Sequence, residues 1–124
     1  MPNHIHLIWR VQNDFTLEEV QRDFLKFTAR EILNAIRIES GERGLEELYV
    51  GLKDRKYQVW KRNSLSVDLI HDWFFKQKFE YLHANPCQPH WQLANRPEDY
   101  KFSSAKFYET GEREFDFLCH FEDV

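Results

Sequence analysis

A segment rich in aromatic residues in the second half of the chain restricts the fold more than any other feature. Its apolar side chains are Leu69, Ile70, Trp73, Phe74, Phe75, Phe79 and Leu82. On a helix they occupy most of the circumference, so this helix must pack on more than one side. Ser66 or Asp68 is the expected N-cap. The helix is expected to end near Ala84, because Pro86 disfavours α conformation in Asn85.

Another amphipathic helix is predicted earlier in the chain. Thr16 and Glu19 have the spacing of a capping box, in which each residue satisfies a backbone N–H of the other. The helix is expected to continue to about Ile38, with an apolar stripe at Leu17, Val20, Phe24, Phe27, Ile32, Ala35 and Ile36. Gly41 and Gly44 are expected to end it in a charged, mobile loop.

Shorter elements are predicted around these two helices. Residues 3–11 have the alternation of a strand, with Ile5, Leu7 and Trp9 on one face and His4, His6 and Ile8 on the other. Residues 45–54 are ambiguous between a short helix and an extended segment. Residues 56–61 alternate like a strand. A short helix is expected from Ser103 or Ser104 to Tyr108, after a proline-containing loop over 86–102.

Composition excludes several classes of protein. The chain has 124 residues, which predicts a single domain. No apolar run approaches the length of a membrane span, so no membrane association is expected, and no secretory signal opens the chain. The two cysteines, Cys87 and Cys119, form no disulfide framework, which favours reduced thiols and a cytoplasmic location.

The net charge of −4 argues against a general nucleic-acid-binding protein, but the negative charge is concentrated in one segment. Residues 109–124 carry a net charge of −5, so residues 1–108 carry about +1. We therefore distinguish a main domain, residues 1–108, from an acidic C-terminal tail, residues 109–124.

A basic stretch interleaved with aromatic residues is a candidate DNA-binding surface. Its charged residues are Lys53, Arg55, Lys56, Lys61 and Arg62, and its aromatic residues are Tyr57 and Trp60. Basic groups bind phosphates, and aromatic rings stack on unpaired bases. The alternative is an exposed strand with a solvated basic face.

Four residues form a candidate catalytic set. His4 and His6 lie two apart on the expected strand, so both imidazoles leave the same face and can converge on one metal ion. Tyr81 and Asn85 lie four apart on the expected helix and share a face. An Asn85 amide oxygen is a reasonable third ligand for Mg²⁺ or Mn²⁺.

This set predicts phosphodiester chemistry. The ion would polarise the scissile phosphate, and Tyr81 would attack phosphorus to form a phosphotyrosine intermediate. Lys78, one turn before Tyr81, could contact phosphate or lower the pKa of the phenol, or could simply be solvated. Each residue also has a structural alternative: a surface His pair, a core tyrosine, and an asparagine that ends a helix.

Three motifs in order along the chain resemble a known family. The run from Met1 to Ile8 reads Met-Pro-Asn-His-Ile-His-Leu-Ile. The run from Tyr81 to Pro86 reads Tyr-Leu-His-Ala-Asn-Pro, and the run from Arg96 to Ser104 reads Arg-Pro-Glu-Asp-Tyr-Lys-Phe-Ser-Ser. Together with Val59-Trp60 they resemble the signatures of the single-tyrosine (IS200-like) transposases of insertion sequences, in particular the REP-associated tyrosine transposases.

The resemblance implies an α+β domain, with an antiparallel sheet and ferredoxin-like helix packing. It implies a His-hydrophobe-His endonuclease that cuts and rejoins single-stranded DNA at hairpin-flanked sites. His4, His6 and Asn85 would be the metal ligands, Tyr81 the nucleophile, and Arg96–Ser104 a packing element.

The chain departs from this family in two respects. In the family, a further part of the domain with at least one sheet strand precedes the His pair, so the fold is expected to be incomplete at the N-terminus. An unpaired sheet edge of that kind favours a homodimer or aggregation. The negative net charge is also unusual for a DNA-cutting domain.

Three functions follow from these observations. The first is a metal-dependent transposase or nickase that uses Tyr81. The second is a non-catalytic DNA-binding remnant of such an enzyme, which would bind hairpin DNA without cleaving it. The third is a degenerate fragment without activity, against which a cooperative thermal melt would argue.

Overall fold

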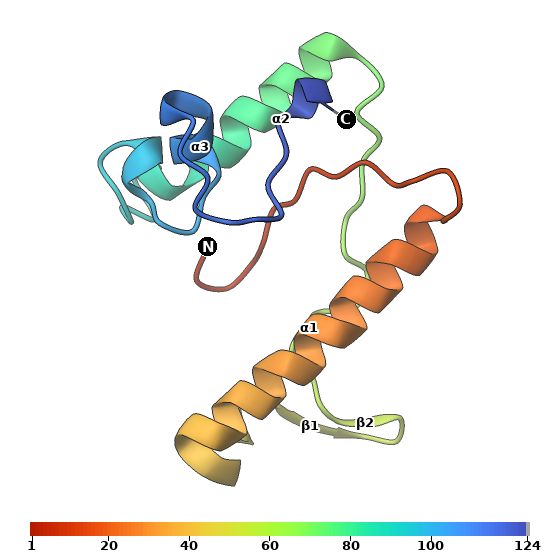
Figure 1. Ribbon diagram of the computed structural model, residues 1–124. Coiled ribbons are helices and arrows are strands. Elements are labelled where there is room, and N and C mark those ends of the chain that lie inside the picture. Colours follow the sequence, from red (N-terminus) through yellow and green to blue (C-terminus); the bar gives the residue numbers. More distant parts are fainter. Residues whose placement is uncertain (124) are drawn as a thin grey trace. The chain divides into compact units, whose positions relative to one another are not determined.

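The computed structural model describes residues 1–123, and their contacts divide the chain into two compact units (Figure 1). The helical unit comprises Met1–Arg10 and the residues from Val67 onward, and the hairpin unit comprises Val11–Ser66. The described residues form three α-helices, several short 3₁₀ helices and one two-stranded antiparallel sheet. The chain is therefore a mixed α+β protein, which agrees with the broad fold class expected from the sequence.

The hairpin unit is organised by α1, Leu17–Ser40, which begins at the predicted capping box. The Thr16 hydroxyl accepts a hydrogen bond from the Glu19 backbone N–H at 3.2 Å, and the Glu19 carboxylate accepts one from the Thr16 N–H at 3.0 Å. Gly41 follows the helix with a φ of 64°, which a residue with a side chain rarely adopts. The capping box is confirmed, and the helix ends two residues beyond the predicted Ile38.

The segment after α1 folds back onto that helix as the 3₁₀ helix η1, Gly41–Leu48, where a mobile loop was expected. Leu45 is completely buried there. Gly44 lies so close to α1 that a Cβ atom at this position would be 2.7 Å from Ile36 Cγ2. Burial of Leu45 and the absence of a side chain at Gly44 together explain why η1 packs against α1.

A short hairpin follows η1. Its strands are β1, Tyr49–Leu52, and β2, Arg55–Tyr57, which pair antiparallel with an irregular register (Figure 1). The strand expected over 56–61 continues only to Tyr57. The Trp60 indole N–H instead donates to the Thr28 hydroxyl of α1 at 2.9 Å, which attaches the chain after the hairpin to the helix.

The helical unit is built on α2, Asp72–Ala84. The helix ends at the predicted residue, and Asn85–Cys87 continues as a turn of 3₁₀ helix. The reason expected for this end is wrong, because Asn85 itself is in the α conformation, with φ −56° and ψ −44°. Pro86 has no backbone N–H and so cannot continue the α-helical hydrogen bonds. The start was predicted too early: residues 64–70 have no regular secondary structure, the N-cap is His71, and neither Ser66 nor Asp68 caps the helix.

The remaining elements of the helical unit are short. They are the 3₁₀ helix η3, Pro97–Asp99, the helix α3, Ala105–Thr110, and the 3₁₀ helix η4, Phe121–Asp123. Near the C-terminus, Phe121 packs its ring on Phe75 at a centroid distance of 5.0 Å and on Phe79 at 5.5 Å. The acidic segment therefore docks on α2 through an aromatic residue.

Residues 3–11 form no strand, so the prediction of an N-terminal strand is wrong for the described chain. A strand requires a neighbour that accepts its backbone hydrogen bonds, and within residues 1–123 only β1 and β2 pair with each other. The apolar residues of this segment remain largely exposed, among them Ile5 at 47% and Leu7 at 44%.

Few side chains of the described chain are buried. Leu45, Pro86 and Ala105 are the buried apolar residues, and His83 and Asn85, at the end of α2, are the buried polar ones. Because burying polar groups is costly without partners, the two buried polar residues direct attention to this end of the helix. None of the helices within residues 1–123 combines the length and apolarity required to cross a bilayer.

Candidate metal centre and nucleophile

Asn85 connects the end of α2 to the N-terminal segment. Its side chain is 2% exposed, and its backbone N–H donates to the Tyr81 carbonyl as the C-cap of the helix. The side-chain Nδ2 lies 2.9 Å from His6 Nε2. An amide nitrogen can only donate here, so His6 Nε2 accepts the hydrogen bond and the His6 proton resides on Nδ1.

His4 lies next to His6, with ring centroids 4.9 Å apart in an edge-to-face arrangement. His4 Nδ1 is 2.7 Å from Asn3 Oδ1. A carbonyl oxygen only accepts, so His4 Nδ1 carries the proton and its Nε2 retains a lone pair. On both histidines Nε2 is therefore the nitrogen with the lone pair; on His6 that lone pair accepts the Asn85 amide, so a cation would have to displace this hydrogen bond. Asn3 orients His4 in the way that outer partners orient metal-binding histidines.

Tyr81 stands beside this histidine pair. Its ring centroid is 5.7 Å from that of His6, in an edge-to-face arrangement, and the side chain is 52% exposed. One helical turn separates Tyr81 from Asn85, so both face the N-terminal segment. The structure thus brings together His4, His6, Asn85 and Tyr81, although the expected N-terminal strand is absent.

The electrostatics of the histidines favour their neutral forms. Desolvation is the main cause that lowers the pKa of His4, and it also lowers the pKa of His6, with repulsion from His4 as the second cause. Neutral imidazole is the form that binds metals. Both lowered pKa values therefore favour neutral imidazoles at neutral pH.

The donor set fits a divalent ion only if the Asn85 amide takes part. Within residues 1–123 there is no cluster of three or more His, Cys, Asp or Glu side chains able to hold a metal. Two imidazoles and one amide oxygen suit a cation that accepts nitrogen and oxygen ligands, such as Mn²⁺, and leave positions for water and phosphate.

Trp91 also borders this set, and sequence reasoning did not select it. Its ring centroid is 5.5 Å from that of His4, with an angle of 56° between the planes. The residue is half-buried and lies in the turn after α2. The signal in the sequence that could have identified Trp91 is its position, an aromatic residue a few places after Asn85 and Pro86.

His83 is a further functional candidate that the sequence analysis missed. It is 9% exposed, and its Nε2 lies 2.8 Å from the Ser104 hydroxyl at the N-cap of α3. Its ring packs edge-to-face on Phe79 at 4.3 Å. This contact fastens the last turn of α2, from which Tyr81 and Asn85 project, to α3.

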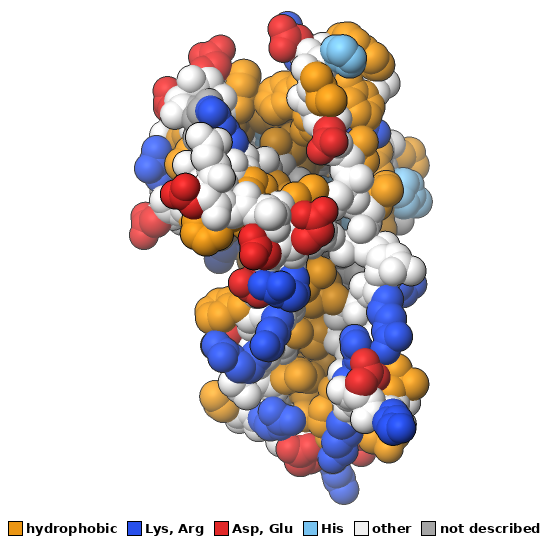
Figure 2. Space-filling view, turned by 90° about the vertical axis from the view of Figure 1, so that its right-hand side faces the viewer, with side chains coloured by type: hydrophobic (Ala, Val, Ile, Leu, Met, Phe, Trp, Pro, Cys, Tyr) orange, Lys and Arg blue, Asp and Glu red, His pale blue; other side chains and the backbone are white. Residues whose placement is uncertain are grey.

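The predicted basic stretch is partly neutralised. Asp54 binds Arg55 at 2.7 Å and Arg62 at 3.0 Å. Lys53 and Lys61 form no ion pair with any described residue, and Lys56 lies 5.1 Å from the ring centroid of Tyr57. Figure 2 shows Lys and Arg side chains gathered over the part of the chain that holds α1 and the hairpin.

The aromatic members of the basic stretch have structural contacts. Trp60 is held by Thr28, and the Tyr57 hydroxyl donates to Glu42 at 2.9 Å. Both side chains therefore already make contacts within the protein, which limits how their rings can stack on a base. In the helical unit, the Lys78 ammonium lies 5.2 Å from the ring centroid of Phe74, which indicates a cation–π contact.

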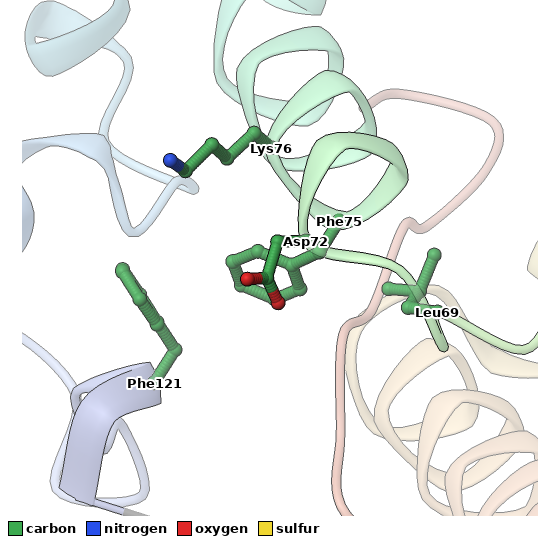
Figure 3. A pocket seen from close by; sticks show the side chains of 5 residues that line it. All are labelled: Leu69, Asp72, Phe75, Lys76 and Phe121. Atoms are coloured by element: carbon green, nitrogen blue, oxygen red, sulfur yellow. The ribbon is translucent and has the colours of Figure 1, made fainter.

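A shallow pocket lies near the other end of α2, lined by Leu69, Asp72, Phe75, Lys76 and Phe121 (Figure 3). In the figure, Phe121 faces the helix from the C-terminal segment. Tyr81 lies nine helical steps after Asp72, a rise of about 14 Å, so this pocket is not part of the histidine–tyrosine site.

Comparisons with protein-family models, with curated proteins and with solved structures give no significant match to this chain. The functional argument therefore depends on the residues and geometry described above.

Proposed function

We propose that this protein cleaves and rejoins single-stranded DNA through a covalent intermediate on Tyr81, as the single-tyrosine transposases do. The observation that carries the proposal is the convergence of His6 with Asn85 and Tyr81. His6 lies far from Tyr81 and Asn85 in the sequence, yet it is in hydrogen-bond contact with one and ring contact with the other. The exposure of Tyr81 leaves its hydroxyl accessible to a polymer substrate.

His4, His6 and Asn85 would hold the divalent ion, Mg²⁺ or Mn²⁺. When bound, the ion supplies Lewis-acid polarisation of a phosphodiester. Tyr81 provides the nucleophile: its phenol loses its proton as the oxygen forms a bond to phosphorus, and the bond from phosphorus to one sugar oxygen breaks. The sugar oxygen takes up a proton and leaves as a hydroxyl, so the net transfer of one proton balances the step. The phosphotyrosine keeps the energy of the broken ester for rejoining.

The same proposal includes a larger antiparallel sheet with ferredoxin-like helix packing. The described residues contain only the two strands β1 and β2 of such a sheet, and all four residues of β1 are exposed. A second copy in a homodimer is one way to add strands to such an edge.

The direct test is adduct formation. The purified chain would be incubated with labelled single-stranded DNA that contains hairpins, with Mg²⁺ or Mn²⁺, and resolved under denaturing conditions. We expect a covalent protein–DNA band that disappears in Tyr81→Phe and persists in Tyr49→Phe, a matched change of an exposed tyrosine in the hairpin unit. A wild-type chain that forms no adduct with a broad panel of strands would contradict the proposal.

A non-catalytic DNA-binding remnant is the second candidate. The observation that favours it is the N-terminal segment, which carries both histidines yet pairs with no described strand. A site on an unpaired segment is less rigid than one on a sheet. Salt-dependent binding to hairpin DNA without any adduct would select this function.

A further inference from the structure

Trp91 is held in a fixed turn directly after the candidate site. Its backbone N–H and that of Gln92 both donate to the Gln88 carbonyl at 2.9 Å. The Leu93 N–H donates to the Pro86 carbonyl at 2.9 Å, which ties the far end of the turn to the residue next to Asn85. Gln92 has a φ of 49°, a conformation that a non-glycine residue adopts only where the surroundings impose it.

This turn places an aromatic surface beside the histidine pair. The ring centroids of Trp91 and His4 are 5.5 Å apart, and those of His4 and His6 are 4.9 Å apart. Trp91 is half-buried, so the residue remains partly accessible to a ligand. On the other side of the pair, the Tyr81 ring lies 5.7 Å from that of His6, so a series of ring contacts runs from Trp91 through both histidines to Tyr81.

Unpaired DNA bases stack on such rings. A base in a single strand has two exposed faces, and an indole held by its backbone loses little freedom when a base stacks on it. A scissile phosphate near His4 and His6 has a nucleotide on each side, and one of those bases must lie within a few ångströms of the site.

We propose that Trp91 is the stacking platform for the unpaired base next to the phosphate that Tyr81 attacks. This inference rests on the proposed function and identifies its substrate as a strand that is single-stranded at the point of cleavage. Trp91 acts by binding: it positions the nucleotide and takes no part in bond making.

The experiment compares two ligands of equal length and charge: a short oligothymidylate, and the same sugar–phosphate chain without bases. Affinities are measured by fluorescence anisotropy without divalent ions, for wild type, Trp91→Ala, Trp91→Phe and Trp73→Ala. Trp73 is the matched control, because it is 67% exposed on α2 and stacks on His71, away from the histidine pair. Thermal melts of each variant report on folding.

We expect wild type to prefer the strand with bases. Trp91→Ala should weaken its binding roughly five- to one-hundred-fold, the size of a lost base–aromatic stack, and leave binding of the abasic chain unchanged. Trp91→Phe should retain most of the preference, and Trp73→Ala should match wild type. Equal losses for both ligands in Trp91→Ala, or no loss for either, would overturn the inference.

The two proposals fail separately. If wild type forms the Tyr81 adduct while Trp91→Ala binds oligothymidylate normally, only the stacking role is wrong. If Trp91 determines base-dependent binding and no adduct forms on any strand, the stacking role stands and the catalytic proposal is wrong.

Discussion

The amide Nδ2 of Asn85 donates a hydrogen bond to His6 Nε2 at 2.9 Å, and it thereby links residues seventy-nine positions apart in the chain. The bond uses the same His6 lone pair that a metal would use. A cation shared by both residues would require the Asn85 side chain to turn its oxygen, in place of its nitrogen, toward the site. The geometry thus makes Asn85 the residue on which metal binding should depend most visibly.

The effect of replacing Asn85 on Mn²⁺ affinity should depend on whether the new side chain can bind the ion. Asn85→Ala removes the amide ligand and should weaken Mn²⁺ binding by about tenfold or more. Asn85→Asp supplies a carboxylate, the ligand type that hard cations prefer, and should bind at least as tightly as wild type. Electron paramagnetic resonance of free Mn²⁺ measures both. His71→Ala is the control, and unchanged affinity in Asn85→Ala would remove Asn85 from the ligand set.

The buried His83 should make the protein less stable in mild acid. Burial lowers the pKa of His83 below its ordinary value of 6.5, so the folded state binds fewer protons than the unfolded state between these two values. The stabilisation is complete above about pH 6.5 and decreases as the pH falls toward the folded-state pKa. His83→Gln keeps a group that can hydrogen-bond Ser104 but does not titrate. Urea unfolding at several pH values measures this effect. As the pH falls, the free energy of unfolding should decrease less in His83→Gln than in wild type. The same dependence on pH in both proteins would show that His83 is not the group responsible.

A methyl group at position 44 should disturb the contact between η1 and α1. The Cβ of Gly44→Ala would be 2.7 Å from Ile36 Cγ2 and 2.8 Å from Ser40 Cβ, so side chains or backbone must move. The free energy of unfolding should fall by about 1–3 kcal/mol. Arg43→Ala, at the exposed neighbouring position, should change it by less than about 0.5 kcal/mol. Chemical denaturation measures both, and equal effects would argue against this packing.

Neutralising Asp54 should strengthen binding to single-stranded DNA if the basic stretch contacts it. Asp54 pairs with both Arg55 and Arg62, so Asp54→Asn releases two guanidinium groups for phosphates. Lys61→Gln should have the opposite effect and reduce the slope of log affinity against log salt by about 0.7 for one lost phosphate contact. Anisotropy titrations over a range of salt concentrations give both values. A weaker complex in Asp54→Asn would show that DNA binds elsewhere.

Phe121 should contribute to stability although it lies in the acidic C-terminal segment. Its ring contacts Phe75, Phe79 and Tyr108, and it is 38% exposed. Phe121→Ala should cost about 1–2 kcal/mol of unfolding free energy, the value expected for a partly buried aromatic ring. Phe117→Ala removes a ring that is 76% exposed and should cost much less. Thermal melts compare the pair, and equal stability would mean that the segment does not dock.

Local signals in the sequence determined the helices well. The Thr16–Glu19 capping box, the Gly41 terminator and Pro86 act on immediate neighbours, through hydrogen bonds made or, at Pro86, a backbone N–H that is missing, and they need no distant partner. These boundaries were therefore predictable to within about two residues. The apolar positions of α2 also indicated a helix packed on several sides, and Phe121 supplies one such contact.

The strands and the site depended on distant parts of the chain. Alternation over residues 3–11 predicts a strand only if another strand lies beside it, and no described residue provides one. The spacing of His4 and His6, and of Tyr81 and Asn85, predicted two separate pairs. Only the tertiary structure placed the pairs in contact, added Trp91 beside His4, and joined His83 to Ser104. Contacts between residues so far apart depend on how the chain packs in three dimensions, and residue spacing along one helix or strand carries no information about that packing.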